Sequence, residues 1–508
     1  MIKKLNRFTQ NAFLILMIIM SIAVFILPLQ SIYELSRRMT FGIIVAYALL
    51  ILIVYIIIKK IKLENKYAEI ISVILIIVLG LALRIGTDQI MKSVPISDFA
   101  TPHAVYHLKD TGIFAKRNSV ADNSFYQTYY STFPAWYPYM QVVSVIYNIF
   151  GENIMNIKIL NWILFTLTSI ALYFTCKNSF SKRTGIFAIL LFTLFPSHII
   201  YSNITTPDHL SIFLITLWLL TWSKIVYYRK NEKKKEVIIF SILNILCVCL
   251  INLFKPLSIF GILVFICAEI LCFTNILIEK ETRKKYLKSG FIYCLSFILI
   301  CFLALNIENK ILYKVVEKKT NTKVVDATSL YLLWGYSIDE KKQYNSKPAN
   351  DIYDYILAKN NNDVEKSIEE VKSIAKDQFI NNLPYLPSIL WQKFFIAYYN
   401  EYDLFTIANH SNDAIYDQKI SDNYLKIYNY IANGYMSMLF FLIIVALIKE
   451  LRSKKRNFMI FISSLIIIGY TCILVFGGVQ PRYKALIFGP ICFLAASSLE
   501  LRKREKEC

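Results

Sequence analysis

The chain has 508 residues, of which 56% are hydrophobic and 18% are charged, and its net charge is +21. A soluble domain is roughly 45–50% apolar, so this composition, gathered in runs of about 20 apolar residues, excludes a soluble enzyme and a disordered chain. A net charge of +21 also suits a nucleic-acid-binding protein, but here the basic residues border the apolar runs, which is typical of a membrane protein. We therefore expect a lipid bilayer and no nucleic acid as partner.

The apolar runs predict an all-α polytopic membrane protein with about twelve transmembrane helices. The first run is followed by Leu29-Gln30-Ser31 and not by a small-residue cleavage site, so we expect a retained helix rather than a signal peptide. The predicted spans are 11–29, 41–58, 68–86, 158–176, 185–201, 209–228, 237–253, 257–278, 289–307, 431–448, 458–476 and 485–501.

The distribution of basic residues predicts the orientation of these spans. The segments on one side hold 30 of the 56 basic residues, whereas the four short links on the other side hold five. Because Lys and Arg accumulate on the cytoplasmic side, we expect both termini in the cytoplasm. The abundance of Ile, Lys and Asn favours a bacterial plasma membrane as the location.

Two large segments on the outer side divide the chain. The apolar stretch Pro138–Phe150 has only 13 residues, too few to cross a bilayer, and predicts a juxtamembrane helix on the outer surface. The second large segment is polar and predicts an outer helical loop domain. The expected divisions are two additional N-terminal helices (1–67), a transmembrane core that includes the outer loop 87–157 (68–307), the outer helical domain (308–430), and C-terminal helices with a basic inner tail (431–508).

Several motifs are absent from the sequence, and their absence narrows the chemistry. No phosphate-binding G-x-x-x-x-G-K-[ST] and no G-x-G-x-x-G occur, and the inner loops are too short for a nucleotide-sugar domain. The chemistry is therefore expected on the outer face, with a substrate that is already activated in the membrane.

Asp98 follows the third span among apolar and aromatic neighbours. Such a carboxylate could have a raised pKa and act as a general base. Alternatively it caps a helix that starts near Thr101 with Pro102 in its first turn, and the two roles are compatible. A divalent metal held by His103, His107 and nearby carboxylates is a further alternative, although no ligand spacing supports it.

Asp208 and His209 lie in a short outer link that begins near Pro196. Asp208 could cap the sixth span, or it could present a second carboxylate at the mouth of a cavity shared with Asp98.

Outer cations accompany these carboxylates. Arg482 and Lys484 flank Tyr483 in the last outer link, and Lys255 stands in another. Arginine offers two parallel donors to a phosphate, whereas the alternative is ordinary anchoring by snorkelling cations at the interface. Arg84 lies inside the outer end of the third span, where a charge needs a partner.

Five features carry a resemblance to a known family: Asp98, Trp136-Tyr137-Pro138-Tyr139, Pro196 to Asp208, Lys255-Pro256 and Gln480-Pro481-Arg482-Tyr483. Together they resemble the GT-C class of polyprenyl-phosphate-sugar glycosyltransferases. The closest branch is the family 39-like group that includes protein O-mannosyltransferases and the lipid A aminoarabinose transferase. The resemblance covers about 68–501. Two departures leave the acceptor and any metal open, because Asp98 lacks the usual acidic neighbour and Trp136-Tyr137-Pro138 replaces a His-Pro-Pro or Lys-Pro-Pro.

The resemblance implies an inverting transfer on the outer face. The donor would be a sugar on a polyprenyl monophosphate, and the acceptor a glycan, lipid or protein of the cell envelope. Asp98 would be the general base, with Asp208 as second catalytic carboxylate. The implied phosphate ligands are Arg482, Lys484, Lys255 and Arg84, and the implied cavity residues are Trp136, Tyr137, Tyr483, His103 and His209.

Two other functions remain as alternatives. A glycan polymerase or ligase would use a lipid diphosphate carrier at the same face. A secondary transporter is disfavoured, because the two halves show no matching interruptions and Glu269 is the one clear mid-membrane carboxylate.

Overall fold

The computed structural model describes residues 2–30, 34–60, 65–93, 124–151, 153–203, 206–278, 280–399, 418–453 and 456–500. Almost all of these residues are helical, and among them the one β-type contact is an isolated bridge between Ile338 and Tyr344. The all-α fold expected from the apolar runs is therefore confirmed.

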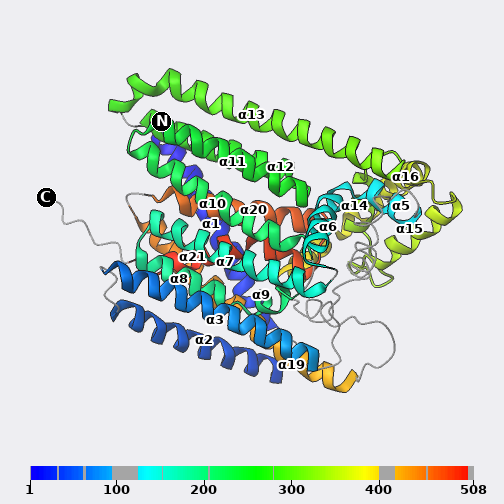
Figure 1. Cartoon of the computed structure of the whole chain (residues 1–508), viewed down its shortest axis with the longest axis horizontal. Helices are drawn as coiled ribbons and strands as arrows, with labels where there is room; N and C mark the ends of the chain where they lie inside the picture. Colours follow the sequence, from blue (N-terminus) through cyan, green and yellow to red (C-terminus); the bar gives the residue numbers. More distant parts are fainter. Residues whose placement is uncertain are drawn as a thin grey trace.

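Long helices lie side by side along the longest axis of the molecule (Figure 1). Within the described residues, eight helices contain a stretch long and apolar enough to cross a membrane, and α2 and α12 contain shorter apolar stretches. The polytopic character is thus confirmed, while the number of twelve spans stays a prediction. The long helices are α1 (Ile2–Ile26), α2 (Glu34–Lys60), α3 (Lys66–Ser93), α7 (Ile154–Ser179), α10 (Asp208–Lys230), α11 (Lys234–Phe254), α12 (Ser258–Ile278), α13 (Lys280–Thr320), α19 (Gln418–Arg452) and α20 (Phe458–Phe476).

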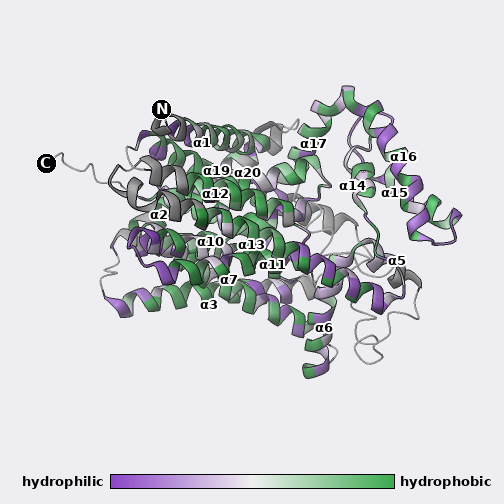
Figure 2. Ribbon diagram, turned by 90° about the horizontal axis from the view of Figure 1, so that it is seen from above, coloured by the Kyte–Doolittle hydropathy of each residue, from purple (hydrophilic) through white to green (hydrophobic). Residues whose placement is uncertain are grey.

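The outward faces of several long helices are apolar. Leu52 on α2, Leu75 on α3 and Leu299 on α13 are each about half exposed or more, and hydrophobic residues line the long helices in Figure 2. A bilayer supplies the apolar surroundings that such faces need.

The predicted span 185–201 is broken into two helices. Helix α8 (Lys182–Thr193) ends before Phe195, and α9 (Pro196–Tyr201) starts at the proline. Proline lacks a backbone N–H and disfavours helical geometry in the residue before it, which accounts for the break. The short α9 leads directly to Asp208.

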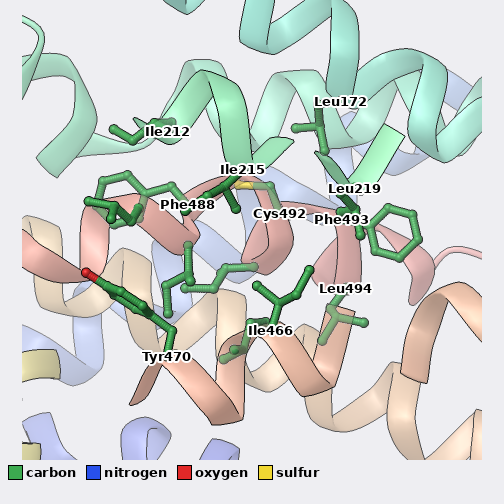
Figure 3. Packing of buried hydrophobic residues seen from close by; sticks show 14 of the residues in the cluster. Leu172, Ile212, Ile215, Leu219, Ile466, Tyr470, Phe488, Cys492, Phe493 and Leu494 are labelled. Atoms are coloured by element: carbon green, nitrogen blue, oxygen red, sulfur yellow. The ribbon is translucent and has the colours of Figure 1, made fainter. Parts of the chain in front are cut away.

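The predicted span 485–501 also differs from a single helix. The 3₁₀ helix η4 (Pro481–Ile487) precedes α21 (Phe488–Ser497), and every residue of α21 is buried. A side chain in place of Gly489 would collide with Thr216 of α10, so this glycine permits a close helix approach. Figure 3 shows the core that results, with α21 side chains packed against α7, α10 and α20.

Short helices gather at one end of the bundle, beside the last turns of α13 (Figure 1). We call α14–α17 (Thr328–Tyr398) the helical cap. Helix α13 continues unbroken through the expected domain boundary at 308. The short elements are α5 (Ser124–Thr132), η2 (Pro134–Trp136), α6 (Tyr137–Phe150), α14 (Thr328–Gly335), α15 (Lys347–Lys359), α16 (Val364–Asn382), η3 (Leu383–Tyr385) and α17 (Leu386–Tyr398).

Candidate active site

Asp208 begins α10 and is buried, with 1% of its surface exposed. Its position is the first helical residue and not the N-cap, and Pro207, the N-cap, makes no side-chain capping bond. One carboxylate oxygen accepts a hydrogen bond from the hydroxyl of Tyr201, and the other forms an ion pair with the ammonium of Lys255. Asp208 thus makes these two contacts and not the capping bond that the sequence offered as one alternative. Its negative charge is still favourable there, because a helix N-terminus carries a partial positive charge.

Lys255 reaches this carboxylate from the end of α11. The chain leaves the helix in an extended conformation at Lys255, as the residue before a proline prefers. Its ammonium lies 5.6 Å from the ring centre of Trp136 and 5.1 Å from that of Tyr483. Aromatic faces stabilise a cation at this distance. Lys255 therefore joins Asp208, Trp136 and Tyr483, which the sequence separates widely.

Arg482 lies in η4 and is 4% exposed. Burial alone would lower the pKa of its guanidinium, but Tyr483, Tyr201 and Asp208 nearby raise the pKa above its usual value. Two of its nitrogen atoms, Nε and Nη1, are buried without a hydrogen-bond partner among the described residues. Arg482 is therefore held as a cation with donors that no described protein group uses.

The link that carries Arg482 is fixed from the bundle. The hydroxyl of Tyr470 on α20 donates to the backbone carbonyl of Tyr483 over 3.1 Å. Lys484 is fully buried. Because Arg482 and Lys484 are both buried, neither is a snorkelling anchor at a water interface.

Among the described residues around Asp208, positive charges outnumber negative ones. Lys255 and Arg482 both approach Asp208, and in the described part of the chain Arg482 forms no ion pair. Burying a cation without a counter-charge is costly. The arrangement therefore favours the binding of an anion, and a phosphate matches the paired donors of an arginine.

Arg84 finds a partner other than a carboxylate. It is fully buried on α3, its Nη2 donates to Nδ1 of His198 over 2.6 Å, and its guanidinium lies 3.5 Å from the ring centre of Phe165. His198 and Phe165 therefore engage Arg84, and its role as a phosphate ligand stays a prediction.

His209 links this inner pair to Asp208. Its ring centre is 5.9 Å from that of His198, and its Nε2 donates to the backbone carbonyl of Tyr201 over 2.8 Å. Since Tyr201 also donates to Asp208, His209 supports the carboxylate through Tyr201.

The aromatic wall of the site comes from α5, η2 and α6. Tyr137 is buried edge-to-face against Tyr130, with ring centres 5.7 Å apart. Tyr137 thus supports Trp136, which carries the contact with Lys255.

Three residues singled out in the sequence, Asp98, His103 and His107, lie outside the described residues. Among the residues that are described, no group of three His, Cys, Asp or Glu side chains could hold a metal ion.

Sequence reasoning missed Tyr201 and a buried ion pair. Tyr201 is one of 34 tyrosines, and no local pattern distinguishes it. Asp88 on α3 and Lys158 on α7 form an ion pair of 2.6 Å with both side chains buried. The available signal for that pair was a charged residue near the end of each of two apolar runs, because a charge there needs a partner.

Residues 134–307, about a third of the chain, match the family of dolichyl-phosphate-mannose-protein mannosyltransferases, a family with the GT-C fold. No curated protein matches the chain. The matched stretch contains Trp136, Asp208 and Lys255 and ends before Arg482.

Proposed function

We propose that this membrane glycosyltransferase of the GT-C type takes its sugar from a polyprenyl monophosphate, undecaprenyl monophosphate in a bacterium. The acceptor is a hydroxyl group of the cell envelope, and transfer occurs on the outer face of the plasma membrane. The family match supports a lipid-linked donor and a membrane setting. The observation that carries the proposal is Arg482, a buried guanidinium with two unpartnered donor atoms beside Lys255.

Arg482 and Lys255 would hold the donor phosphate. The guanidinium offers its charge and two N–H donor atoms that no described group uses, and the ammonium of Lys255 adds a second charge beside Asp208. The polyprenyl chain would lie along the apolar outer faces of the bundle. The negative charge that develops on the leaving phosphate is then stabilised by groups already in place.

The reaction is a single displacement at the anomeric carbon. The acceptor oxygen forms a bond to that carbon as the bond from the carbon to the phosphate oxygen breaks, so the configuration inverts. The phosphate leaves with the bonding electron pair as polyprenyl monophosphate. Asp98 takes the proton of the acceptor hydroxyl. No protein acid is needed, since the leaving group is already a stable anion.

Asp208 has a supporting role in this scheme. Its carboxylate is engaged by Lys255 and Tyr201 and is not available as a base while those contacts hold. It orients Lys255 toward the phosphate and limits the net charge of the empty site.

The test uses purified protein in detergent with radiolabelled undecaprenyl-monophosphate sugars and a mixture of cell-envelope acceptors. We expect release of undecaprenyl monophosphate and labelling of an acceptor. Turnover of lipid diphosphate donors alone would indicate the polymerase or ligase, and turnover of neither donor would overturn the proposal. Arg452→Lys, an exposed arginine on α19, is the matched control for Arg482→Lys.

A further inference from the structure

A lysine in the helical cap has surroundings that the proposed reaction does not use. Lys393 on α17 is fully buried. Its ammonium donates to the backbone carbonyls of Gly335, over 2.9 Å, and of Gly477. Within the described ranges no carboxylate forms an ion pair with it. A buried charge with only carbonyl and ring partners needs a structural or functional reason.

Both carbonyls belong to helix ends. Gly335 is the last residue of α14, and Gly477 is the C-cap of α20. Because the C-terminus of a helix carries a partial negative charge, one ammonium there stabilises two helix ends at once. The rings of Tyr336 and Tyr344, at 5.1 and 5.3 Å, complete the enclosure of the cation.

The two glycines also lie close together, with no room for a side chain between them. A Cβ atom added at Gly335 would lie 3.2 Å from the carbonyl oxygen of Gly477, tighter than ordinary contact. Lys393 therefore closes a direct junction between the helical cap and the end of α20.

Gly477 is where the chain turns toward the proposed phosphate ligand. Only Gly478, Val479 and Gln480 separate it from η4, which holds Arg482. Tyr344 of the cap makes a hydrogen bond to the backbone of Val479. The cap thus holds the connecting residues 477–480 at two points, whereas Tyr470 holds the far side of the link at Tyr483.

The geometry points to Lys393 as a positioning residue that fastens the helical cap to the link 477–484 and so fixes the guanidinium of Arg482. This inference rests on the proposed function where it concerns phosphate binding. The fastening of the link is a separate property and can be measured separately.

The first measurement follows backbone hydrogen–deuterium exchange in the full-length protein in detergent. Lys393→Met keeps most of the side-chain volume and removes the donors and the charge. We expect faster exchange across residues 477–484, with the interior of α20 unchanged. Lys376→Met, an exposed lysine on α16, is the control and should leave exchange unchanged. Unchanged exchange across the link in Lys393→Met would overturn the inference.

The second measurement is binding of undecaprenyl monophosphate alone. Loss of one charge-assisted contact predicts that Lys393→Met binds about tenfold more weakly, and Tyr344→Phe should show a smaller loss. The double variant Lys393→Met/Arg482→Lys should lose less binding affinity than the product of the two single-variant losses, because both substitutions act through one guanidinium. Binding equal to wild type in Lys393→Met, where Arg482→Lys is weakened, contradicts the inference.

The two proposals fail in different ways. If wild-type protein binds no undecaprenyl monophosphate, the proposed function fails, and the exchange measurement still decides whether Lys393 fastens the link. If Lys393→Met does not fold, Lys393→Gln provides the same test, because it keeps a polar side chain but removes the charge and shortens the reach to the two carbonyls. Lys393→Gln should then raise exchange across 477–484, and unchanged exchange overturns the inference.

Discussion

The ammonium of Lys255 is ion-paired with the carboxylate of Asp208, so the first residue of α10 is tied to the end of α11. In this pair the carboxylate is almost fully buried and the lysine is mostly buried. Removing one partner of a buried pair is more damaging than the pair is stabilising, because the remaining charge has no counter-ion. The pair therefore sets the charge of the site before any donor binds.

Asp208→Asn keeps the shape of the side chain and removes its charge. We expect a lower melting temperature and reduced but measurable turnover, because Lys255 loses its orientation while the proposed base is untouched. Scanning fluorimetry and the donor-release assay measure the two effects. Asp377→Asn, an exposed position on α16, serves as control. Wild-type turnover in Asp208→Asn would remove the carboxylate from the site.

Asp98→Asn tests the proposed base. Asparagine keeps the capacity to cap a helix but cannot accept the acceptor proton at a useful pKa. We expect nearly complete loss of turnover with normal membrane insertion and normal binding of undecaprenyl monophosphate. Near-normal turnover indicates that Asp98 is only a cap. Loss of activity in Asp208→Asn but not in Asp98→Asn would reverse the two roles.

The predicted orientation can be tested by labelling in intact cells. A cysteine at Ser346, the N-cap of α15, should react with an impermeant thiol reagent, because the helical cap is expected outside. A cysteine at Asn231, the C-cap of α10, should not react. Wild-type protein with its ten native cysteines gives the background. The opposite labelling pattern would put the site on the cytoplasmic face and contradict the reaction proposed for it.

The fold class and part of the site could be predicted from the sequence. Apolar runs identified the long helices because a membrane span has a fixed length, and an outer cation beside a proline drew attention to Lys255 and Arg482. Pro196 was predicted to begin an outer link, but the separate helix α9 was less accessible, since hydrophobicity continues across the proline. The burial of α21 was also inaccessible, because lipid-facing and core-facing apolar residues have the same composition.

Partners of the site residues were the least predictable feature. The charge of Arg84 inside an apolar helix indicated that this residue has a polar partner. Nothing in the sequence identifies that partner as His198, which lies 114 positions further along the chain. Lys393 gave a weaker indication of a buried partner, because it is the single charge within the apolar and aromatic stretch of α17. Both depend on packing between helices that are far apart in the sequence, and local patterns contain no information on that packing.

The burial of Lys393 predicts a pH-dependent stability. Burial lowers its pKa from 10.5 to about 8. Between those values the unfolded chain keeps a proton that the folded protein has lost, so the free energy of unfolding rises with pH in that window. The groups that face the ammonium, two carbonyls and the rings of Tyr336 and Tyr344, carry no opposite charge in this range.

The measurement compares melting temperatures of wild-type protein and Lys393→Met from about pH 7 to about pH 10. Wild-type protein should gain stability relative to the variant as the pH rises. Lys376→Met, whose lysine is exposed, should follow the wild-type curve. Parallel curves for wild-type protein and Lys393→Met would contradict a lowered pKa at Lys393.

The last prediction separates a positioned guanidinium from a point charge. Arg482→Lys preserves the charge but loses the paired donors, and such an exchange is not conservative at a bidentate site. Loss of a charge-assisted hydrogen bond costs about 1.5–3 kcal/mol, which is roughly 10- to 150-fold in rate if the bond strengthens in the transition state. Donor turnover should therefore fall by about that factor, while Arg452→Lys, at an exposed arginine, leaves it unchanged. If Arg482 only anchored the link, lysine would replace it with little effect, because both side chains carry the charge to the same place. Equal rates for Arg482→Lys and wild-type protein would therefore remove the phosphate from this position and leave Arg482 a structural cation.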